Sequence, residues 1–275
     1  MNQERKAELK KQANEVRKGI VTAVHSAKSG HPGGSLSAAD ILTYLYFEEM
    51  NIDPQNPKKA DRDRLVLSKG HIAPALYSVL SHRGYFPTSD LTTLRHTGSY
   101  LQGHPDMKHI PGVDMSSGSL GQGLSAAVGM ALNAKLDNSA YRVYAVCGDG
   151  EIQEGQIWEA AMFAASRKLD NLTVFVDNNN LQIDGPIDQV CSPYPIDEKF
   201  AAFGFHVINI DGHNFDEIEA AVNEAKATKG QPTAIIAKTV KGKGVSFMEN
   251  QCGWHGKAPN DEEFEQALKD LEVTE

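Results

Sequence analysis

The sequence predicts an α/β protein built as a single domain over residues 1–275, with a doubly wound, mainly parallel sheet flanked by helices. Apolar runs of strand length alternate with amphipathic segments of helix length along the chain. Two of these runs end in polar turns, Gly-Asp-Gly at residues 148–150 and Asp-Asn-Asn-Asn at residues 177–180. Because neighbouring parallel strands end at the same edge of a sheet, we expect both turns at the edge where open sheets bind ligands.

The first half of the chain is expected to contribute mostly helices. Apolar residues at helical spacing, with many charges between them, predict a helix over residues 4–27. Dense Gly and Pro predict an irregular loop over residues 29–36, followed by a second helix at about residues 37–50. A short buried strand at residues 64–68 leads into another helix, and residues 94–123 form a long loop. Loops of this length inside a compact domain are usually functional.

The second half is expected to alternate strands and helices. No break in composition, repeat or low-complexity linker divides it, which favours one domain. The expected elements are a strand ending at Gly148, a helix starting at Glu154, a strand at 172–176, a helix at 197–203, a strand at 206–210, a helix at 215–228, a strand at 233–239 and a final helix at 261–271.

Composition argues against several classes of protein. The net charge of −9 argues against a nucleic-acid surface, and no stripe of Lys or Arg overrides it. The first residues form no signal peptide, and no apolar run approaches the ~20 residues of a membrane span. The three cysteines are widely spaced without a Cys-x-x-Cys pair, so neither a disulfide framework nor a zinc site is indicated. We therefore expect a cytoplasmic protein that binds neither nucleic acid nor a membrane.

The two polar turns suit a divalent metal bound to a diphosphate. Mg²⁺ prefers octahedral oxygen ligands and usually combines one or two carboxylates with phosphates. Asp149 offers a carboxylate, Asn179 an amide oxygen and Leu181 a backbone carbonyl, so we expect these residues to hold the metal. Gly148 and Gly150 leave backbone N–H groups uncovered, so a phosphate can approach the helix N-terminus behind them. Gly-Asp-Gly alone would usually be a simple turn, but the Asn pair and the strand before each turn favour a ligand site.

These motifs carry a family resemblance. Gly-Asp-Gly followed by Asn-Asn, with 27 residues between them, resembles the thiamine diphosphate fingerprint. The stretch Gly-Asp-Gly-Glu-Ile-Gln-Glu-Gly-Gln-Ile-Trp-Glu-Ala at 148–160, with Leu-Gln-Ile-Asp-Gly at 181–185, resembles transketolase. Matching pieces extend from residue 29 to residue 256, which is most of this chain but only the amino-terminal part of a usual transketolase. The resemblance implies thiamine diphosphate as cofactor and Mg²⁺ or Ca²⁺ as its metal.

The resemblance also implies roles for four histidines. His31, in Ser-Gly-His-Pro-Gly, matches a histidine that touches the sugar, although local sequence alone fits a turn residue equally well. His71, in Lys-Gly-His at a strand-to-helix junction, matches a cofactor-contacting histidine, and helix capping is the alternative. His104 matches the histidine near the first carbon of the donor sugar, and His255 matches one that reaches the cofactor diphosphate and the substrate. Histidine, with an unperturbed pKa of ~6.5, suits proton transfer near neutral pH.

The remaining implied site residues lie in a glycine-rich loop and at one helix start. Many relatives have Pro where Ser119 stands, a change that should preserve the backbone contact to the cofactor. Glu154 matches a residue between the two halves of the site and is expected at the interface between subunits, although an ordinary first-turn acidic residue is the alternative. The expected roles are catalytic for His31, His104 and His255; cofactor-binding for His71, Gly118, Ser119, Leu120, Gly148, Gly150, Asn179 and His255; and metal-binding for Asp149, Asn179 and Leu181.

A transketolase moves a two-carbon ketol unit from a ketose phosphate to an aldose phosphate, with thiamine diphosphate as electron sink. In this family a glutamate on a second, pyrimidine-binding domain completes the site. This sequence reaches Glu275 without that domain or the C-terminal domain. The final helix favours a complete subunit over a fragment. We therefore expect the N-terminal subunit of a split transketolase, inactive alone. Its expected partner is a C-terminal subunit carrying the pyrimidine-binding domain, and the expected assembly is a heterotetramer.

Three alternatives stay open at this point. The nearest is the diphosphate-binding subunit of another two-chain thiamine diphosphate enzyme that acts on a different ketose. A 2-oxoacid dehydrogenase α-type subunit is less favoured, because it would not need this set of sugar-facing histidines. A non-catalytic interaction protein is least favoured, because every matched cofactor-facing position is intact.

Overall fold

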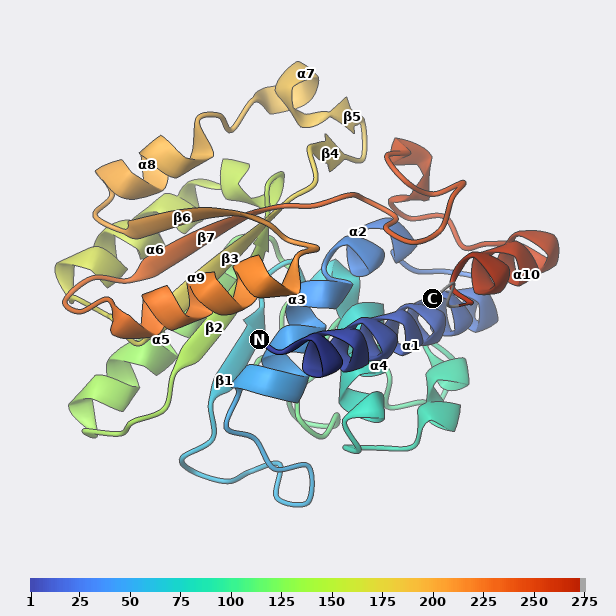
Figure 1. Ribbon diagram of the computed structural model, residues 1–275, viewed down its shortest axis with the longest axis horizontal. Coiled ribbons are helices and arrows are strands. Elements are labelled where there is room, and N and C mark those ends of the chain that lie inside the picture. The colour runs from blue at the N-terminus through green and yellow to red at the C-terminus, as the bar shows by residue number, and fades with distance from the viewer. Residues whose placement is uncertain (273–275) are drawn as a thin grey trace.

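A central five-stranded parallel sheet lies between two layers of helices in the computed structural model, which describes residues 1–272 (Figure 1). The strands are β1 (Arg64–Leu67), β2 (Val143–Gly148), β3 (Leu172–Asn178), β6 (His206–Asp211) and β7 (Thr233–Lys238). Their order is β1-β2-β3-β7-β6, and every neighbouring pair is parallel. The chain thus builds the sheet from β1 to β3, crosses to the far edge at β6 and returns to place β7 between them, which confirms the predicted fold class.

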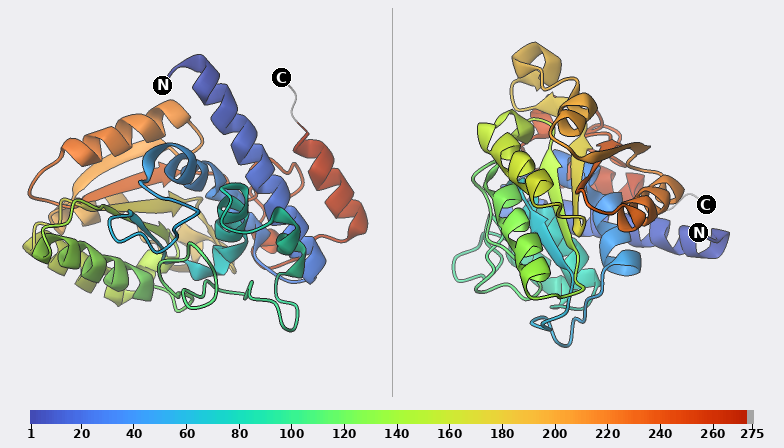
Figure 2. Two further views of the ribbon diagram at one scale, coloured as in Figure 1. Left: turned by 90° about the horizontal axis from the view of Figure 1, so that it is seen from below. Right: turned by 90° about the vertical axis from the view of Figure 1, so that its left-hand side faces the viewer.

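Helices cover both faces of the sheet (Figure 2). One layer contains α1 (Gln3–Ala27), α2 (Pro32–Ser37), α3 (Ala39–Tyr44), α4 (Ala73–His82) and α9 (Phe215–Ala227), with α10 (Asp261–Asp270) packed on α1. The other layer contains α5 (Gln122–Leu136), α6 (Gly155–Ser166) and α8 (Ile196–Ala202). A two-stranded hairpin, β4 (Leu181–Gln182) with β5 (Gly185–Pro186), and the short helix α7 (Ile187–Cys191) project beyond the end of β3.

Alternate residues of each strand feed two separate hydrophobic cores. Tyr144 and Val146 of β2 pack with the α1 layer, whereas Val143, Ala145 and Cys147 pack with the α5 layer. Successive side chains of a strand point to opposite faces, so a strand covered on both sides must be apolar throughout. This explains why β2 and β3 appear in the sequence as continuous apolar runs rather than as alternating patterns.

The predicted loop at residues 29–36 is wrong, because α2 begins at Pro32. Pro is well tolerated in the first turn of a helix, and here it starts one. The two glycines that suggested a loop instead permit close packing. A Cβ on Gly33 would lie 2.8 Å from the Trp254 carbonyl oxygen, and a Cβ on Gly34 would lie 3.0 Å from Ile72 Cγ2. The second predicted helix, at about residues 37–50, consists of α3 and a π-helical turn at Leu45–Glu49.

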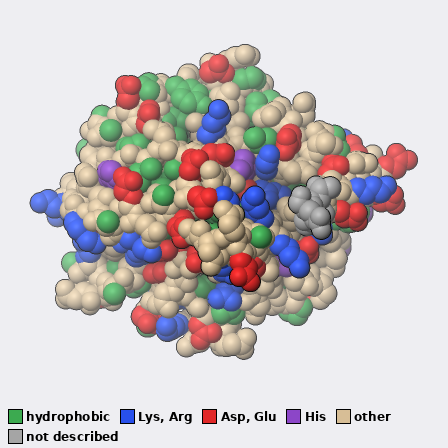
Figure 3. Space-filling view, in the orientation of Figure 1, with side chains coloured by type: hydrophobic (Ala, Val, Ile, Leu, Met, Phe, Trp, Pro, Cys, Tyr) green, Lys and Arg blue, Asp and Glu red, His purple; other side chains and the backbone are tan. Residues whose placement is uncertain are grey.

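The other predicted elements are confirmed to within a few residues, including the long connection between Leu94 and α5. Three short 3-10 turns at Gly70–Ile72, Thr88–Thr93 and Glu151–Gln153, together with a fourth at Cys252–Trp254, were not predicted, and neither were the β4–β5 hairpin and α7. No helix within residues 1–272 is long and apolar enough to span a membrane. On the face shown in Figure 3, Lys and Arg side chains are interspersed with Asp and Glu.

The strands that matter for the site end at one edge of the sheet. Lys69 follows β1, Asp149 follows β2, Asn179 follows β3 and Lys241 lies shortly after β7. The register pairs Gly148 with Asp177 across β2 and β3, so the two polar turns begin side by side as expected. This convergence of strand ends creates the candidate site.

Candidate functional site

A cavity of about 350 Å³ opens at this carboxyl edge. Most of the predicted site residues line it, although they come from elements spread along more than 220 residues of the chain. The lining includes His31, His71, Gly118, Leu120, Gly148, Asp149, Gly150, Glu154, Asn179, Leu181 and His255. The structure thus brings most of the predicted residues together around one cavity, whose walls also include Lys69, Glu151 and Lys241.

Three of the histidines form a compact triangle in the cavity. The ring centroids of His31, His71 and His255 lie 5.2 to 5.3 Å from one another. His31 precedes the first turn of α2, His71 lies in the 3-10 turn after β1, and His255 follows the 3-10 turn near the end of the chain. Packing between α2 and these two turns brings the rings together, which no local sequence pattern could specify.

All three rings are neutral at physiological pH. Burial, with the nearby Arg95 and His104, lowers the pKa of His31 to about 4. Burial, with the Lys69 ammonium, lowers the pKa of His71 to about 2, and burial with Lys241 lowers the pKa of His255 to about 3. Each neutral imidazole offers one N–H donor and one acceptor nitrogen.

Replacing His71 with Gln should make stability less dependent on pH. The folded-state pKa of His71 is depressed to about 2, whereas an unfolded histidine titrates near ~6.5, so below that pH the unfolded state binds one more proton. Folding stability must then fall as pH falls. Between pH ~7.5 and ~5 we expect wild type to lose about 2 kcal/mol relative to His71→Gln, measured by urea unfolding at both pH values. Parallel stability curves would contradict the buried neutral ring.

The predicted metal ligands lie next to one another. Asp149 Oδ1 accepts the Gly150 N–H at 2.9 Å, and Oδ2 accepts the Asn180 N–H at 2.6 Å. Asn179 Oδ1 accepts the Leu181 N–H at 3.1 Å. Burial and the neighbouring Asp177 raise the pKa of Asp149 to about 6, so the charged carboxylate is disfavoured. A bound cation would stabilise that negative charge. Within residues 1–272 no three His, Cys, Asp or Glu side chains gather to hold a metal, so a metal here depends on amide, carbonyl and ligand oxygens.

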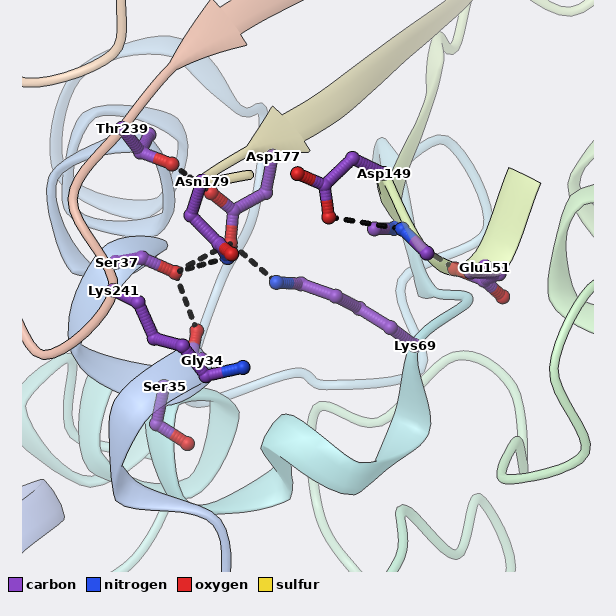
Figure 4. A network of polar contacts seen from close by, with 12 residues as sticks. Gly34, Ser35, Ser37, Lys69, Asp149, Glu151, Asp177, Asn179, Thr239 and Lys241 are labelled. Carbon is purple, nitrogen blue, oxygen red and sulfur yellow. Dashed lines mark hydrogen bonds and ion pairs between the residues drawn. The ribbon is translucent and has the colours of Figure 1, made fainter. Parts of the chain in front are cut away.

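Asp177 is a buried hub that the sequence patterns did not reveal (Figure 4). Its carboxylate is fully buried and forms an ion pair with Lys69, and it accepts hydrogen bonds from Thr239 and, at 2.5 Å, from Ser37. Burial alone would raise the pKa of Asp177, but the charge of Lys69 and these hydrogen bonds hold it below its ordinary value. The sequence does place Asp177 at the end of an apolar strand, which could have indicated a buried carboxylate, and a buried charge needs a partner.

Lys241 is a second cation that the sequence patterns did not reveal. Its side chain is 2% exposed, and its ammonium donates to the Leu181 carbonyl at 3.1 Å and to His255 Nδ1 at 2.9 Å. Since Nδ1 accepts this bond, the proton of His255 resides on Nε2. Burial and the charge of Lys69 lower the pKa of Lys241 to about 8. The Leu181 oxygen has a second lone pair, so it can accept from Lys241 and still contact a metal.

Glu151 fixes the glycine turns around the cavity. Its buried carboxylate accepts the Gly148 N–H at 3.0 Å, the Gly121 N–H at 2.9 Å and the Ser68 hydroxyl at 2.6 Å. It thus connects the end of β2, the loop before α5 and the end of β1. The sequence alone indicated no role for Glu151, since its partners come from distant segments.

Three predicted residues lie outside the cavity or at its rim. His104 is exposed, and its Cδ2 would lie 3.0 Å from a Cβ added to Gly118. Ser119 is exposed beside Gly118 and does not line the cavity. Glu154 is the exposed residue that precedes α6, and it lines the cavity. The roles of these residues in contacts to sugar, cofactor and partner chain remain predictions.

The residues present fit a diphosphate-bearing cofactor with a metal. Two buried ammonium groups, Lys69 and Lys241, line the same cavity as the Asp149 carboxylate and the Asn179 amide, a donor set suited to an anion with a divalent cation. His31 Nδ1 is buried and, among the described residues, has no hydrogen-bond partner. Such an orphaned buried atom indicates a ligand group that supplies the missing bond. Fold and site together define an α/β domain in which the edge of the sheet is suited to binding a diphosphate cofactor.

Comparison with known proteins gives the family. Residues 9–274 match the family described as "Transketolase, thiamine diphosphate binding domain". The chain belongs to the transketolase family, and it is a subunit of a thiamine diphosphate-dependent ketol transferase.

Two kinds of relative are informative. The 6-deoxy-6-sulfo-D-fructose transketolase subunit of Clostridium sp. (strain MSTE9) is 49% identical over 98% of both chains. An apulose-4-phosphate transketolase subunit from Phocaeicola vulgatus is 41% identical over 96% of this chain and 93% of its own. Human transketolase is 42% identical over 98% of this chain but only 43% of its own length. The crystal structure of transketolase from Campylobacter jejuni superposes with a TM-score of 0.91 at 36% identity, over 98% of this chain and 43% of that one.

Proposed function

We propose that this chain is the N-terminal, diphosphate-binding subunit of a split transketolase that transfers a two-carbon ketol unit from an anionic ketose to an aldose phosphate. The observation that carries the proposal is the cavity in which three neutral histidines adjoin Asp149, Asn179 and two buried lysines. The metal is Mg²⁺, or Ca²⁺ in its place. The other functions considered from the sequence have no support from the relatives compared above, which are named transketolases or transketolase subunits.

Different residues would hold the metal and the diphosphate of the cofactor. Asp149, Asn179 and the Leu181 carbonyl would hold the metal, and Lys69, Lys241 and His71 would face the diphosphate. The backbone at Gly148, Gly150 and Gly118 to Leu120 would complete the contacts. When bound, thiamine diphosphate supplies the electron sink for cleavage and formation of the carbon–carbon bond.

The histidines suit the handling of protons at sugar hydroxyls. A neutral His31, with an unpartnered buried Nδ1 among the described residues, can accept or donate a hydrogen bond to a hydroxyl in the cavity. The Lys241 contact keeps His255 in the tautomer that donates from Nε2. His104 lies at the rim, and we propose that it approaches the donor sugar once a partner chain closes the site.

A partner chain is part of the proposal. The relatives of matching length are named subunits, whereas single-chain transketolases are more than twice as long as the region that this chain matches. The partner would carry the pyrimidine-binding domain and would contact the exposed Glu154 and the apolar rim residues Leu120 and Ile183. We propose a heterotetramer of two such pairs, and a cytoplasmic location.

The test measures ketol transfer from xylulose 5-phosphate to ribose 5-phosphate with thiamine diphosphate and Mg²⁺. The assay uses this chain alone, and this chain mixed with the product of the adjacent reading frame. We expect activity only in the mixture. Activity of this chain alone would contradict the need for a second domain, and a mixture that neither binds the cofactor nor transfers a ketol unit would contradict the proposed function.

The donor sugar is a second question for the same mixture. The relative that is 49% identical is named for a sulfonated ketose, and two others are named for apulose 4-phosphate. These sugars share an anionic group remote from the carbonyl. A panel of xylulose 5-phosphate, 6-deoxy-6-sulfo-D-fructose and apulose 4-phosphate would identify the preferred donor from the ratio of kcat/KM values.

A further inference from the structure

The segment that carries Lys241 is held at its backbone on both sides of that residue. The Val240 N–H donates to His213 Nε2 at 2.9 Å, and the Lys243 carbonyl accepts from Arg17 Nε at 3.1 Å. Between them the Gly242 N–H donates to the Gly33 carbonyl at 2.9 Å. Lys241 itself therefore has little freedom to move along the chain direction.

The His213 and Arg17 side chains that hold the backbone on either side of Lys241, here called the two clamps, both contact one buried carboxylate. Asp40 accepts from Arg17 Nη1 at 3.0 Å and Nη2 at 2.5 Å, and from His213 Nδ1 at 2.7 Å. Asp40 and Arg17 are each 5% exposed. Since His213 Nε2 must accept the Val240 N–H, the imidazole proton lies on Nδ1, where it donates to Asp40. Asp40 thus orients the side chain of each clamp, the His213 acceptor and the Arg17 donor.

We propose that Arg17, Asp40 and His213 form a positioning triad that fixes the Lys241 ammonium between the Leu181 carbonyl and His255 and thereby raises the affinity of the cavity for the cofactor diphosphate. The inference rests on the proposed function, because it assumes that the cavity binds that cofactor. None of the three triad residues lines the cavity, so they act through the Lys241 segment and not by direct contact.

The chemistry of lysine explains why such a clamp matters. A lysine side chain is a flexible four-carbon stem, and its ammonium is a point charge whose effect depends on its position. The ammonium of Lys241 reaches a neutral histidine and a predicted metal ligand at once, at 2.9 and 3.1 Å. A displacement of this ammonium away from an anionic ligand weakens their attraction, because Coulomb energy falls with distance. Two backbone clamps beside the residue restrict that displacement.

Three variants test the triad in the two-chain mixture. His213→Leu removes both hydrogen bonds, whereas His213→Gln keeps one donor and one acceptor on a planar group. The control is His206→Leu, which removes the contact between His206 Nε2 and Glu224 Oε1 at 2.7 Å, at the opposite end of β6 from His213 and away from the Lys241 segment. The measurements are the dissociation constant for thiamine diphosphate with Mg²⁺ by calorimetry, kcat at saturating cofactor, and thermal unfolding without ligands.

We expect His213→Leu to weaken cofactor binding about 10- to 100-fold, as loss of a residue that orients a ligand group does. His213→Gln should stay within about threefold of wild type, kcat at saturation should change little, and His206→Leu should bind normally. Wild-type affinity in His213→Leu, or an equal loss in the Leu and Gln variants, would overturn the triad.

A double-mutant cycle with Lys241→Met distinguishes positioning from general stability. If His213 acts through Lys241, His213→Leu will weaken binding by less than about twofold once Lys241 is Met. Additive effects would overturn the proposal, and so would a binding loss explained by lowered thermal stability alone. Should His213→Leu fail to fold, Arg17→Lys takes its place in the cycle, since it keeps the charge beside Asp40 but shortens the reach to Lys243. If the wild-type mixture binds no cofactor, the proposed function fails, not the triad alone.

Discussion

Replacing Asp149 with Ala in the two-chain mixture is expected to reduce ketol transfer by more than about 100-fold. Loss of a residue that merely orients a metal ligand typically costs 10- to 100-fold, so about 100-fold is a lower bound for a direct carboxylate ligand. Asp149 is 2% exposed, and the nearby Glu151 carboxylate is already bonded to Gly148, Gly121 and Ser68. Glu151 therefore cannot substitute for it. Initial rates of ketol transfer at saturating cofactor measure the loss.

Two further variants separate this effect from folding. Asp149→Asn keeps an oxygen acceptor for the Gly150 or Asn180 N–H but removes the charge, and burial with Asp177 already disfavours that charge in the absence of a metal. We expect Asp149→Asn to lose activity while the ligand-free chain unfolds at the same temperature or higher. Asp137→Ala, at the exposed end of α5, should remain active. An active Asp149→Ala mixture would contradict the proposed metal site.

Replacing Lys69 with Met is expected to destabilise the ligand-free chain by about 3–5 kcal/mol, because it leaves the buried Asp177 carboxylate without its cation. Asp177 is 0% exposed and Lys69 is 2% exposed, so water cannot replace the lost partner. The hydrogen bonds from Ser37 and Thr239 remain and place the expected loss toward the lower end of that range. Urea unfolding at neutral pH measures the change.

A surface ion pair provides the matched control for this experiment. Lys28→Met breaks a pair with Asp261 at 3.0 Å, in which the lysine and aspartate side chains are 62% and 85% exposed, and should cost less than about 1 kcal/mol. Combining Lys69→Met with Asp177→Leu should restore much of the lost stability, since replacing a whole buried pair by apolar groups is often nearly neutral. A loss below about 1 kcal/mol in Lys69→Met would show that the buried pair is not needed for folding.

Much of the fold could be predicted because local patterns matched the final structure. Strand and helix positions follow from apolar periodicity, and the parallel direction of the strands follows from the alternation of strands with helices. The exception at residues 29–36 has a tertiary cause. Gly33 and Gly34 indicate a loop by composition, but they are buried in α2, where Trp254 and Ile72 approach too closely for a side chain.

The meeting of Asp149 and Asn179 follows from the order of residues along the chain, because each follows a strand and those strands are neighbours in parallel register. The charges that surround them depend instead on long-range packing. Lys69 and Asp177 are 108 residues apart, and Ser37 and Asp177 are 140 apart, so no local pattern connects them. The same holds for Asp40 and His213 in the clamp, which are 173 residues apart. Periodicity records which face of an element is buried, whereas the pairing of buried charges depends on how distant elements pack.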